Sequence, residues 1–255
     1  FSTTNPVDSP TPTSTSALSP NRAQAERFLA LLDEAADEYT FQTFDDNADR
    51  KDRSLTRIVH GSLEEHWATL VELNQRGAGI FVTINTTDGR GRKTENITHV
   101  RALWQEADRE DEPVLPLEPH VEVESSRGKY HRYLLVDGLS VEEFRGHQQR
   151  LVTDYGSDRA AADLSRVLRL PGFFHQKINA QKGLAGEPFL VRITNESGAL
   201  PYSVQQLREK LPPVDLTPAQ VSESPTAPLT DKARIQSALD ALDPNSDYQT
   251  WLAIG

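Results

Sequence analysis

Two carboxylates close a hydrophobic run at Glu106 and Asp108, and their spacing is what most directly suggests chemistry in this sequence. In a β-strand, residues two apart project to the same side, so a strand ending here would place both acids together. Carboxylate oxygens are preferred ligands of hard divalent cations. The pair therefore predicts a site for Mg²⁺ or Mn²⁺ that assists phosphoryl chemistry. A solvated strand end is the alternative, because acidic residues continue at 110–112.

A second stretch, at 126–131, combines a small hydroxyl, a glycine, cations and a histidine. Backbone amides beside a glycine, together with Ser126, Lys129 and His131, are groups that hold phosphates. An ordinary hairpin turn is the alternative interpretation. The position of this stretch about twenty residues after the acidic pair favours the phosphate site.

A third acidic residue, Asp163, precedes two cations that flank apolar side chains. Asp163 would complete a three-carboxylate site, or it would simply cap a helix. Asp158 is an alternative third acid. Arg166 and Arg169 lie beside buried-looking residues, where cations are usually paired or functional. We expect one of them to meet a phosphate or to orient a carboxylate.

A basic loop carries Arg90, Arg92 and Lys93. It is too short to be a P-loop, and its lysine has no serine or threonine after it. The loop is predicted to touch nucleic-acid phosphates, with a plain surface loop as the alternative.

Composition limits the classes of function. The chain has 255 residues without cysteine, which excludes thiolate catalysis and cysteine-ligated metal sites. Its net charge is −11, but residues 76–182 carry 16 cations and 16 anions, so the acidic excess lies outside the motifs. No run is long enough for a membrane span, and a cytoplasmic protein without membrane contact is predicted. The absence of methionine, even at position 1, suggests an excised fragment.

Periodicity and capping residues predict the elements that position these side chains. Helices are expected from Asn21, from Ser62, from Ser140 to about Tyr155, over 160–164 and over 204–210. Strands are expected over 39–44, 80–84, 100–107, 120–124, 130–136 and 189–193, with a polar loop before position 58. Residues 1–20 are interpreted as a disordered tail and 212–230 as a linker, because both are rich in Ser, Thr and Pro.

Taken in order along the chain, the motifs resemble the archaeo-eukaryotic primase superfamily, most closely plasmid and phage primases related to replication-protein-B primase domains. That family has an acidic-x-acidic motif ending a hydrophobic strand, a serine-to-histidine motif and a later third acid. Residues 103–108, 126–131 and Asp163 match these in order, and 158–172 is the most specific likeness. Two departures are Glu106, where the family more often has Asp, and the four residues between Ser126 and His131.

The resemblance implies an α+β fold, with an RNA-recognition-like antiparallel sheet beside an N-terminal α/β unit, over a catalytic domain at 21–211. It implies a DNA primase or primase-polymerase that joins nucleoside triphosphates on a single-stranded DNA template. Two ions of Mg²⁺ or Mn²⁺ would be held by Glu106, Asp108 and Asp163, and the phosphates by Ser126, Lys129, His131, Arg166 and Arg169.

Residues 231–255 resemble the start of a helical primase C-terminal module, which would connect to a helicase region in a longer chain. Two other functions stay open. A non-catalytic single-strand binding module would use exposed aromatics such as Tyr130, Tyr133 and Phe81. A metal-dependent nuclease would use the same carboxylates.

Overall fold

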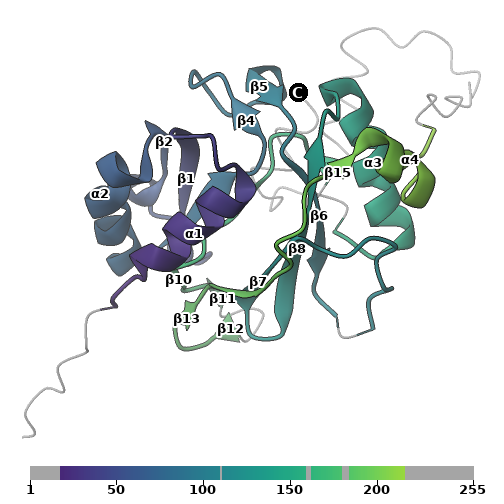
Figure 1. Cartoon of the computed structure of the whole chain (residues 1–255). Coiled ribbons are helices and arrows are strands. Elements are labelled where there is room, and N and C mark those ends of the chain that lie inside the picture. The colour runs from purple at the N-terminus through teal and green to yellow at the C-terminus, as the bar shows by residue number, and fades with distance from the viewer. Residues whose placement is uncertain (1–17, 110, 159–161, 180–183, 216–255) are drawn as a thin grey trace, which may run out of the picture. The chain divides into compact units, whose positions relative to one another are not determined.

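The computed structural model describes residues 18–109, 111–158, 162–179 and 184–215 (Figure 1). Most of the predicted tail (1–20) and linker (212–230) and all of the predicted helical module (231–255) lie outside these ranges, so the domain boundaries stay predictions. Within the described ranges, no helix is long and apolar enough to cross a membrane.

The N-terminal part is a four-stranded antiparallel sheet in the order β2-β1-β3-β9. These strands span Arg57–Gly61, Tyr39–Asp45, Ala78–Thr83 and Val167–Arg169. Helix α1 (Arg22–Leu32) precedes β1 in the sequence, and helix α2 (Leu63–Gln75) lies between β2 and β3. Each begins at a side-chain cap: Asn21 accepts from the Gln24 amide and Ser62 from the Glu65 amide. The last strand of this sheet, β9, comes from far along the chain. It follows the acidic pair and the 126–131 stretch in the sequence.

The second sheet has five strands, in which β8 pairs with β6 along one edge and with β7 and β15 along the other. Strand β14 adds to β7. Strands β6, β7, β8, β14 and β15 span Ala102–Ala107, Val121–Ser126, Lys129–Asp137, Arg192–Glu196 and Tyr202–Ser203. All pairs are antiparallel except that of β15 with β8. The predicted α+β class with an antiparallel sheet is confirmed.

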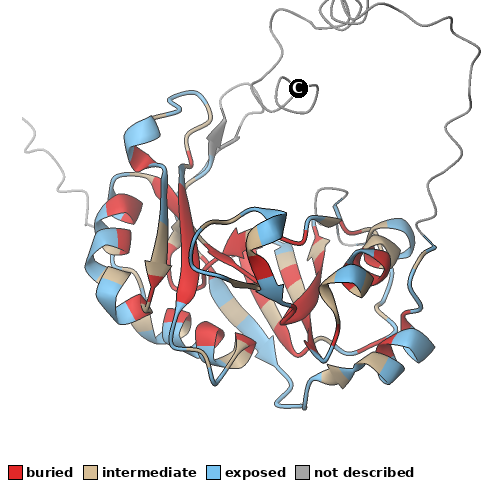
Figure 2. Ribbon diagram, turned by 90° about the horizontal axis from the view of Figure 1, so that it is seen from above, coloured by how far each residue is buried: buried red, intermediate tan, exposed pale blue. Residues whose placement is uncertain are grey.

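Helix α3 (Val141–Asp154) packs against β6. The Gln148 side chain bonds both backbone groups of Trp104, at 3.2 and 2.7 Å, and the Trp104 ring lies 5.4 Å from that of Phe144. Helix α4 (Val204–Lys210) begins at a full capping box on Ser203. Buried residues follow the central strands of both sheets (Figure 2). The motif-bearing strand β6 is thus anchored from its buried side.

Short elements complete the described fold. They are the 3₁₀ turns η1 (Arg53–Leu55) and η2 (Thr94–Asn96) and the paired strands β4 (Thr86–Thr87) with β5 (Ile97–His99), β10 (Phe174–His175) with β13 (Phe189–Leu190), and β11 (Ile178–Asn179) with β12 (Leu184–Ala185).

Most predicted elements are confirmed, but three expectations were wrong or incomplete. Strand β2 was not expected, because an edge strand with exposed side chains has no apolar alternation. The strand expected over 189–193 is broken at Val191, whose backbone bonds Gly172 and Phe173 instead. Of the helix expected over 160–164, residues 160 and 161 lie outside the described residues, and Asp163 itself is not helical.

The Pro171-Gly172 turn is fixed by the start of α1. Gly172 has φ +90°, and its carbonyl accepts from the Asn21 amide at 2.7 Å. A Cβ at this position would collide with the Asn21 carbonyl oxygen and would lie 3.2 Å from the Ala25 amide nitrogen. Only glycine therefore suits both the backbone conformation and the space.

We expect Gly172→Ala to lower the free energy of unfolding by about 2–4 kcal/mol, since left-handed strain and a backbone collision add. Gly198→Ala is the matched control, because Gly198 has φ +66° but an added methyl group there would meet nothing within 4 Å. Urea denaturation of both variants measures the difference. Equal losses for the two would show that the contact with α1 does not constrain the turn.

Candidate active site

A pocket of about 780 Å³ gathers residues from both sheets. Seven of the side chains predicted from the sequence line it: Glu106, Asp108, Ser126, Lys129, His131, Arg166 and Arg169. Asp163 is not among its described lining residues. The three sequence motifs therefore meet at one place, with the exception of the predicted third acid.

Strand register brings the acidic motif and the histidine together. Glu106 on β6 lies directly opposite His131 on β8, and His131 lies opposite Val123 on its other side. The hairpin joining β7 to β8 makes this possible, since Ser126 pairs with Lys129 around a turn in which Gly128 has φ +72°. The predicted hairpin is real, and it delivers the histidine to the carboxylate. The hairpin interpretation of stretch 126–131 is confirmed, and the phosphate site stays a prediction.

Glu106 is held by an arginine from the third motif. The Arg166 guanidinium donates to its carboxylate at 2.8, 3.0 and 3.2 Å, with side-chain exposures of 26% and 14%. Burial raises the pKa of Glu106, and the charge and hydrogen bonds of Arg166 oppose that rise. Nearby Asp158 and Asp108 raise this pKa further. Glu106 thus feels the charges of two further acids, and the Arg166 guanidinium opposes them.

Asp108 lies at the rim of the pocket, where its carboxylate is 3.0 Å from the Lys129 ammonium. The two side chains are 59% and 47% exposed. Such an exposed ion pair contributes little to stability and exchanges partners readily. An incoming cation can therefore replace Lys129 at Asp108.

The two candidates for the third acid, Asp158 and Asp163, have different surroundings. Asp158 acts electrostatically on Glu106, and the neighbouring Ser157 hydroxyl accepts a hydrogen bond from the Glu106 amide at 3.1 Å. Asp163 instead accepts from the amide and hydroxyl of Ser165. Its charge acts on Arg92, outside the pocket. The Asp163 carboxylate therefore shapes the turn before β9.

Two histidines face the pocket in the neutral form. Burial, with the charges of Arg169 and Arg166, lowers the pKa of His131 to about 3. Burial and Arg169 lower the pKa of His175 to about 4. The His175 Nδ1–H donates to the Ser125 carbonyl at 2.8 Å, and Nδ1 of His131 has no partner among the described residues. At neutral pH both rings thus act as hydrogen-bonding groups rather than as cations.

The sequence reasoning missed several pocket residues, among them Ser125, Arg127, His175, Lys177 and Phe189. A usable signal for two of them was present, because His175 and Lys177 follow the Pro-Gly turn at strand spacing. Arg127, Lys129, Arg166, Arg169 and Lys177 outnumber the three carboxylates that line the pocket, which are Glu106, Asp108 and Glu187. That local charge suits a polyphosphate despite the acidic chain as a whole.

The basic loop at 88–96 divides into two parts. Arg92 is directed inward, bonding the Gln42 side chain at 3.2 Å and the Ser165 carbonyl at 3.0 Å. Burial lowers the pKa of Arg92, which Asp163 opposes. Arg90 and Lys93 are exposed and line a shallow hollow with Ile58. Arg92 also lines this hollow, so it combines a structural role with any binding role.

No group of three His, Cys, Asp or Glu side chains within the described ranges is arranged as a ready-made metal site. The donor chemistry nevertheless fits a hard cation, since the acids that surround Glu106 offer carboxylate oxygens only. Each of the two strand carboxylates is paired with a long cationic side chain. These pairs must open for a metal to bind.

Comparison with known proteins identifies the fold and the domain. Residues 101–212 match the family described as the RepB DNA-primase N-terminal domain. A replication protein of Clostridium perfringens is 26% identical over 132 residues, which are 44% of this chain and 32% of that protein. The chain thus aligns with about a third of that relative's length.

Solved structures were compared for the fold. The archaeo-eukaryotic primase domain of the cyanophage S-2L primase-polymerase has a TM-score of 0.58 at 20% identity, covering 76% of this chain and all of that one. Primase RepB′ has a TM-score of 0.49 at 18% identity, covering 70% of this chain and 57% of that one. The fold is that of the archaeo-eukaryotic primase superfamily, as the sequence resemblance predicted. Residues 101–212 are similar to the RepB DNA-primase N-terminal domain.

The neutral state of His131 predicts an acid-sensitive fold. An unfolded histidine titrates near pH 6.5, whereas His131 in the folded chain titrates at about 3. Between these values only the unfolded chain binds the proton, so the stabilisation is complete above pH 6.5 and is lost as pH falls. At pH 5 the loss attributable to His131 is about 2 kcal/mol.

Urea denaturation at pH 7 and pH 5 measures this effect. Between pH 7 and pH 5, we expect the free energy of unfolding of His131→Gln to fall by about 2 kcal/mol less than that of wild type, because the variant lacks the titrating ring. His99→Gln, at an exposed strand position, should keep the wild-type difference. A His131→Gln chain as acid-sensitive as wild type would contradict the neutral assignment.

Proposed function

We propose that this chain is the catalytic part of a DNA primase or primase-polymerase, which joins nucleoside triphosphates on a single-stranded DNA template. The observation that carries the proposal is the convergence of Glu106, Asp108 and His131 with several cations in one pocket. Carboxylates beside polyphosphate-binding cations are the requirements of nucleotidyl transfer. The RepB-type primase domain supports the same class of activity.

Glu106 and Asp108 would hold Mg²⁺ or Mn²⁺, with Asp158 as the third ligand in preference to Asp163. When bound, such ions lower the pKa of the attacking hydroxyl and neutralise charge on the triphosphate. The acids of the chain supply the oxygen ligands and orient them from the end of β6. Their electrostatic proximity, in which Asp158 and Asp108 both act on Glu106, supports this assignment.

The cations that pair with the two strand acids would become phosphate ligands once a nucleotide binds. Arg166 pairs with Glu106, and Lys129 pairs with Asp108. Binding of a metal–nucleotide complex would give each carboxylate a metal ion and each side-chain cation a phosphate oxygen. Every charge would keep a partner of opposite sign during this exchange. This lowers the free-energy cost of the exchange in a partly buried site. Arg169 and neutral His131 complete the phosphate contacts, and Ser126 adds a hydroxyl.

The template would run past the exposed cations Arg90 and Lys93. Their hollow, which includes Ile58, has a volume of about 450 Å³ and offers charge for phosphates beside an apolar surface. Arg92 would contribute by holding the loop in place. A helicase region in the longer protein is part of the proposal, based on the resemblance of residues 231–255.

The rival binding module has less support. Tyr133 is fully buried and packs edge-on against Phe28 at 5.2 Å, so it is not available for base stacking. Phe81 lines the pocket, and Tyr130 lies 6.0 Å from the Arg132 guanidinium. Two partly covered aromatics on different sheets do not form the continuous platform that single-strand binding modules use.

Primer synthesis tests the proposed function directly. Wild type, incubated with single-stranded DNA, labelled nucleotides and Mn²⁺ or Mg²⁺, should make or extend primers. Asp108→Asn should reduce the rate by about 100-fold or more, because it removes a metal ligand. Asp154→Asn, an exposed acid paired with Arg150 on α3, is the control and should stay within twofold. Template cleavage without synthesis would favour the nuclease, and neither activity would favour a binding module.

A second comparison separates the two candidates for the third acid. Asp158→Asn should lower the rate of primer synthesis by about 100-fold. Asp163→Asn should mainly lower stability, by about 1 kcal/mol, because it weakens the turn bonds to Ser165. Synthesis rates and urea midpoints of both variants give the answer. The reverse pattern would restore Asp163 as the metal ligand.

A further inference from the structure

Asp46 follows β1 directly and makes a buried ion pair with Arg169, 123 residues away. The two carboxylate oxygens accept from the two terminal guanidinium nitrogens at 2.8 and 3.0 Å. Both side chains are nearly inaccessible, at 5% and 11% exposure. Such a two-point contact fixes the plane of the guanidinium as well as its position. Asp46 itself is not a described lining residue of the pocket, whereas Arg169 is.

Two further contacts leave Arg169 a single orientation. Its guanidinium lies 4.7 Å from the centre of the Phe81 ring, which is its register partner on β3. Beneath the ion pair lies Gly79, where a Cβ would collide with Asp46 Oδ1 and would lie 2.7 Å from Arg169 Nη1. The ion pair therefore crosses the sheet over Gly79, which has no side chain to obstruct it.

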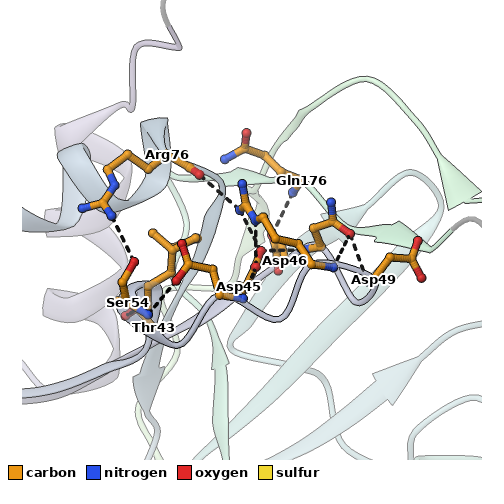
Figure 3. Close-up of polar contacts among 12 residues, drawn as sticks. Thr43, Asp45, Asp46, Asp49, Ser54, Arg76 and Gln176 are labelled. Carbon is orange, nitrogen blue, oxygen red and sulfur yellow. Dashed lines mark hydrogen bonds and ion pairs between the residues drawn. The ribbon is translucent and has the colours of Figure 1, made fainter.

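The same carboxylate also holds a second segment that lines the pocket. Oδ2 of Asp46 accepts from the backbone amide of Gln176 at 2.8 Å (Figure 3). Gln176 lies between His175 and Lys177, both of which line the pocket. Asn74 supports this segment by bonding the amide and carbonyl of Phe174, at 3.0 and 2.8 Å. One side chain thus ties β9 to the segment 174–177.

We propose that Asp46 is a positioning residue that holds Arg169, together with the segment that carries Lys177 and the neutral His175, in place to receive the phosphates of a nucleotide. Asp46 accepts from two of the five N–H groups of Arg169, and the other three make no hydrogen bond to a described residue. A polyphosphate would meet an arginine whose orientation was fixed before binding. This inference rests on the proposed function, because it assumes that the ligand is a nucleoside triphosphate.

The neighbouring acid supplies a matched control. Asp45, labelled in Figure 3, also makes a two-point contact, accepting from Nε and one terminal nitrogen of Arg50 at 2.8 and 2.8 Å, and it accepts from the amides of Asn47 and Asp52. Arg50 is not a described lining residue of the pocket. Asp45→Asn therefore removes an equivalent ion pair from the same turn and leaves the pocket wall untouched.

The experiment compares Asp46→Asn with Asp45→Asn in primer extension and in direct binding of dGTP with Mn²⁺ by calorimetry. For Asp46→Asn we expect KM and Kd for dGTP to rise about 10- to 100-fold with a smaller change in kcat. Asp45→Asn should keep both within twofold, and Asp46→Glu should recover part of the affinity. An Asp46→Asn chain that is folded by circular dichroism and binds dGTP like wild type would overturn the proposal.

Gly79→Ala tests the idea without removing a charge, and it replaces Asp46→Asn if that chain does not fold. The added methyl group displaces the ion pair, so dGTP binding should weaken while Asp46 and Arg169 both remain. Unchanged binding would overturn the proposal. Failure of the proposed function would give a different result. Wild type would then bind dGTP and Asp46→Asn would bind it more weakly, but wild type would synthesise no primer. Wild type that binds no dGTP would overturn both.

Discussion

The segment from Arg166 to Arg169 connects the two sheets through a pair of ionic contacts. Arg166 reaches Glu106 on β6, and Arg169 reaches Asp46 beside β1. Between them, β9 joins the N-terminal sheet by pairing with β3. The pocket exists because β9 pairs within the first sheet, whereas Arg166, which directly precedes β9, binds Glu106 of the second sheet. Neither sheet alone would assemble the acids and the cations.

Local sequence signals predicted most of the framework but not its long-range contacts. The caps at Asn21, Ser62 and Ser140 marked three helices, and apolar runs marked β3, β6 and β8. Strands β2 and β9 were missed, since an edge strand and a three-residue strand carry no usable periodicity. The partnership of Asp46 with Arg169 was also beyond prediction, because nothing in either local sequence specifies a contact 123 residues away.

The sequence predicted most of the side chains that gather in the pocket, and the identity of the third acid stays a proposal. Motif order correctly grouped Glu106, Asp108 and His131, because adjacent strands bring such motifs into register. Asp163 and Asp158 are five residues apart, and sequence likeness favoured the one that the fold uses to stabilise a turn. The neutral histidines were equally unpredictable, since their low pKa values come from burial beside arginines distant in sequence. Side-chain direction and burial are properties of the assembled fold.

The contribution of β9 to the N-terminal sheet bears on how the protein is divided for study. The recognisable RepB-type segment, 101–212, contains β9 but lacks β1 and β3, and with them the strand beside β9 and the acid that holds Arg169. A fragment cut at residue 101 would expose an unpaired strand edge and a buried arginine without its counter-ion. Such a fragment would aggregate or fail to fold, so the region recognised by homology is smaller than the unit that folds. The shortest fragment worth expressing begins at Asn21, whose amide closes the Pro171-Gly172 turn.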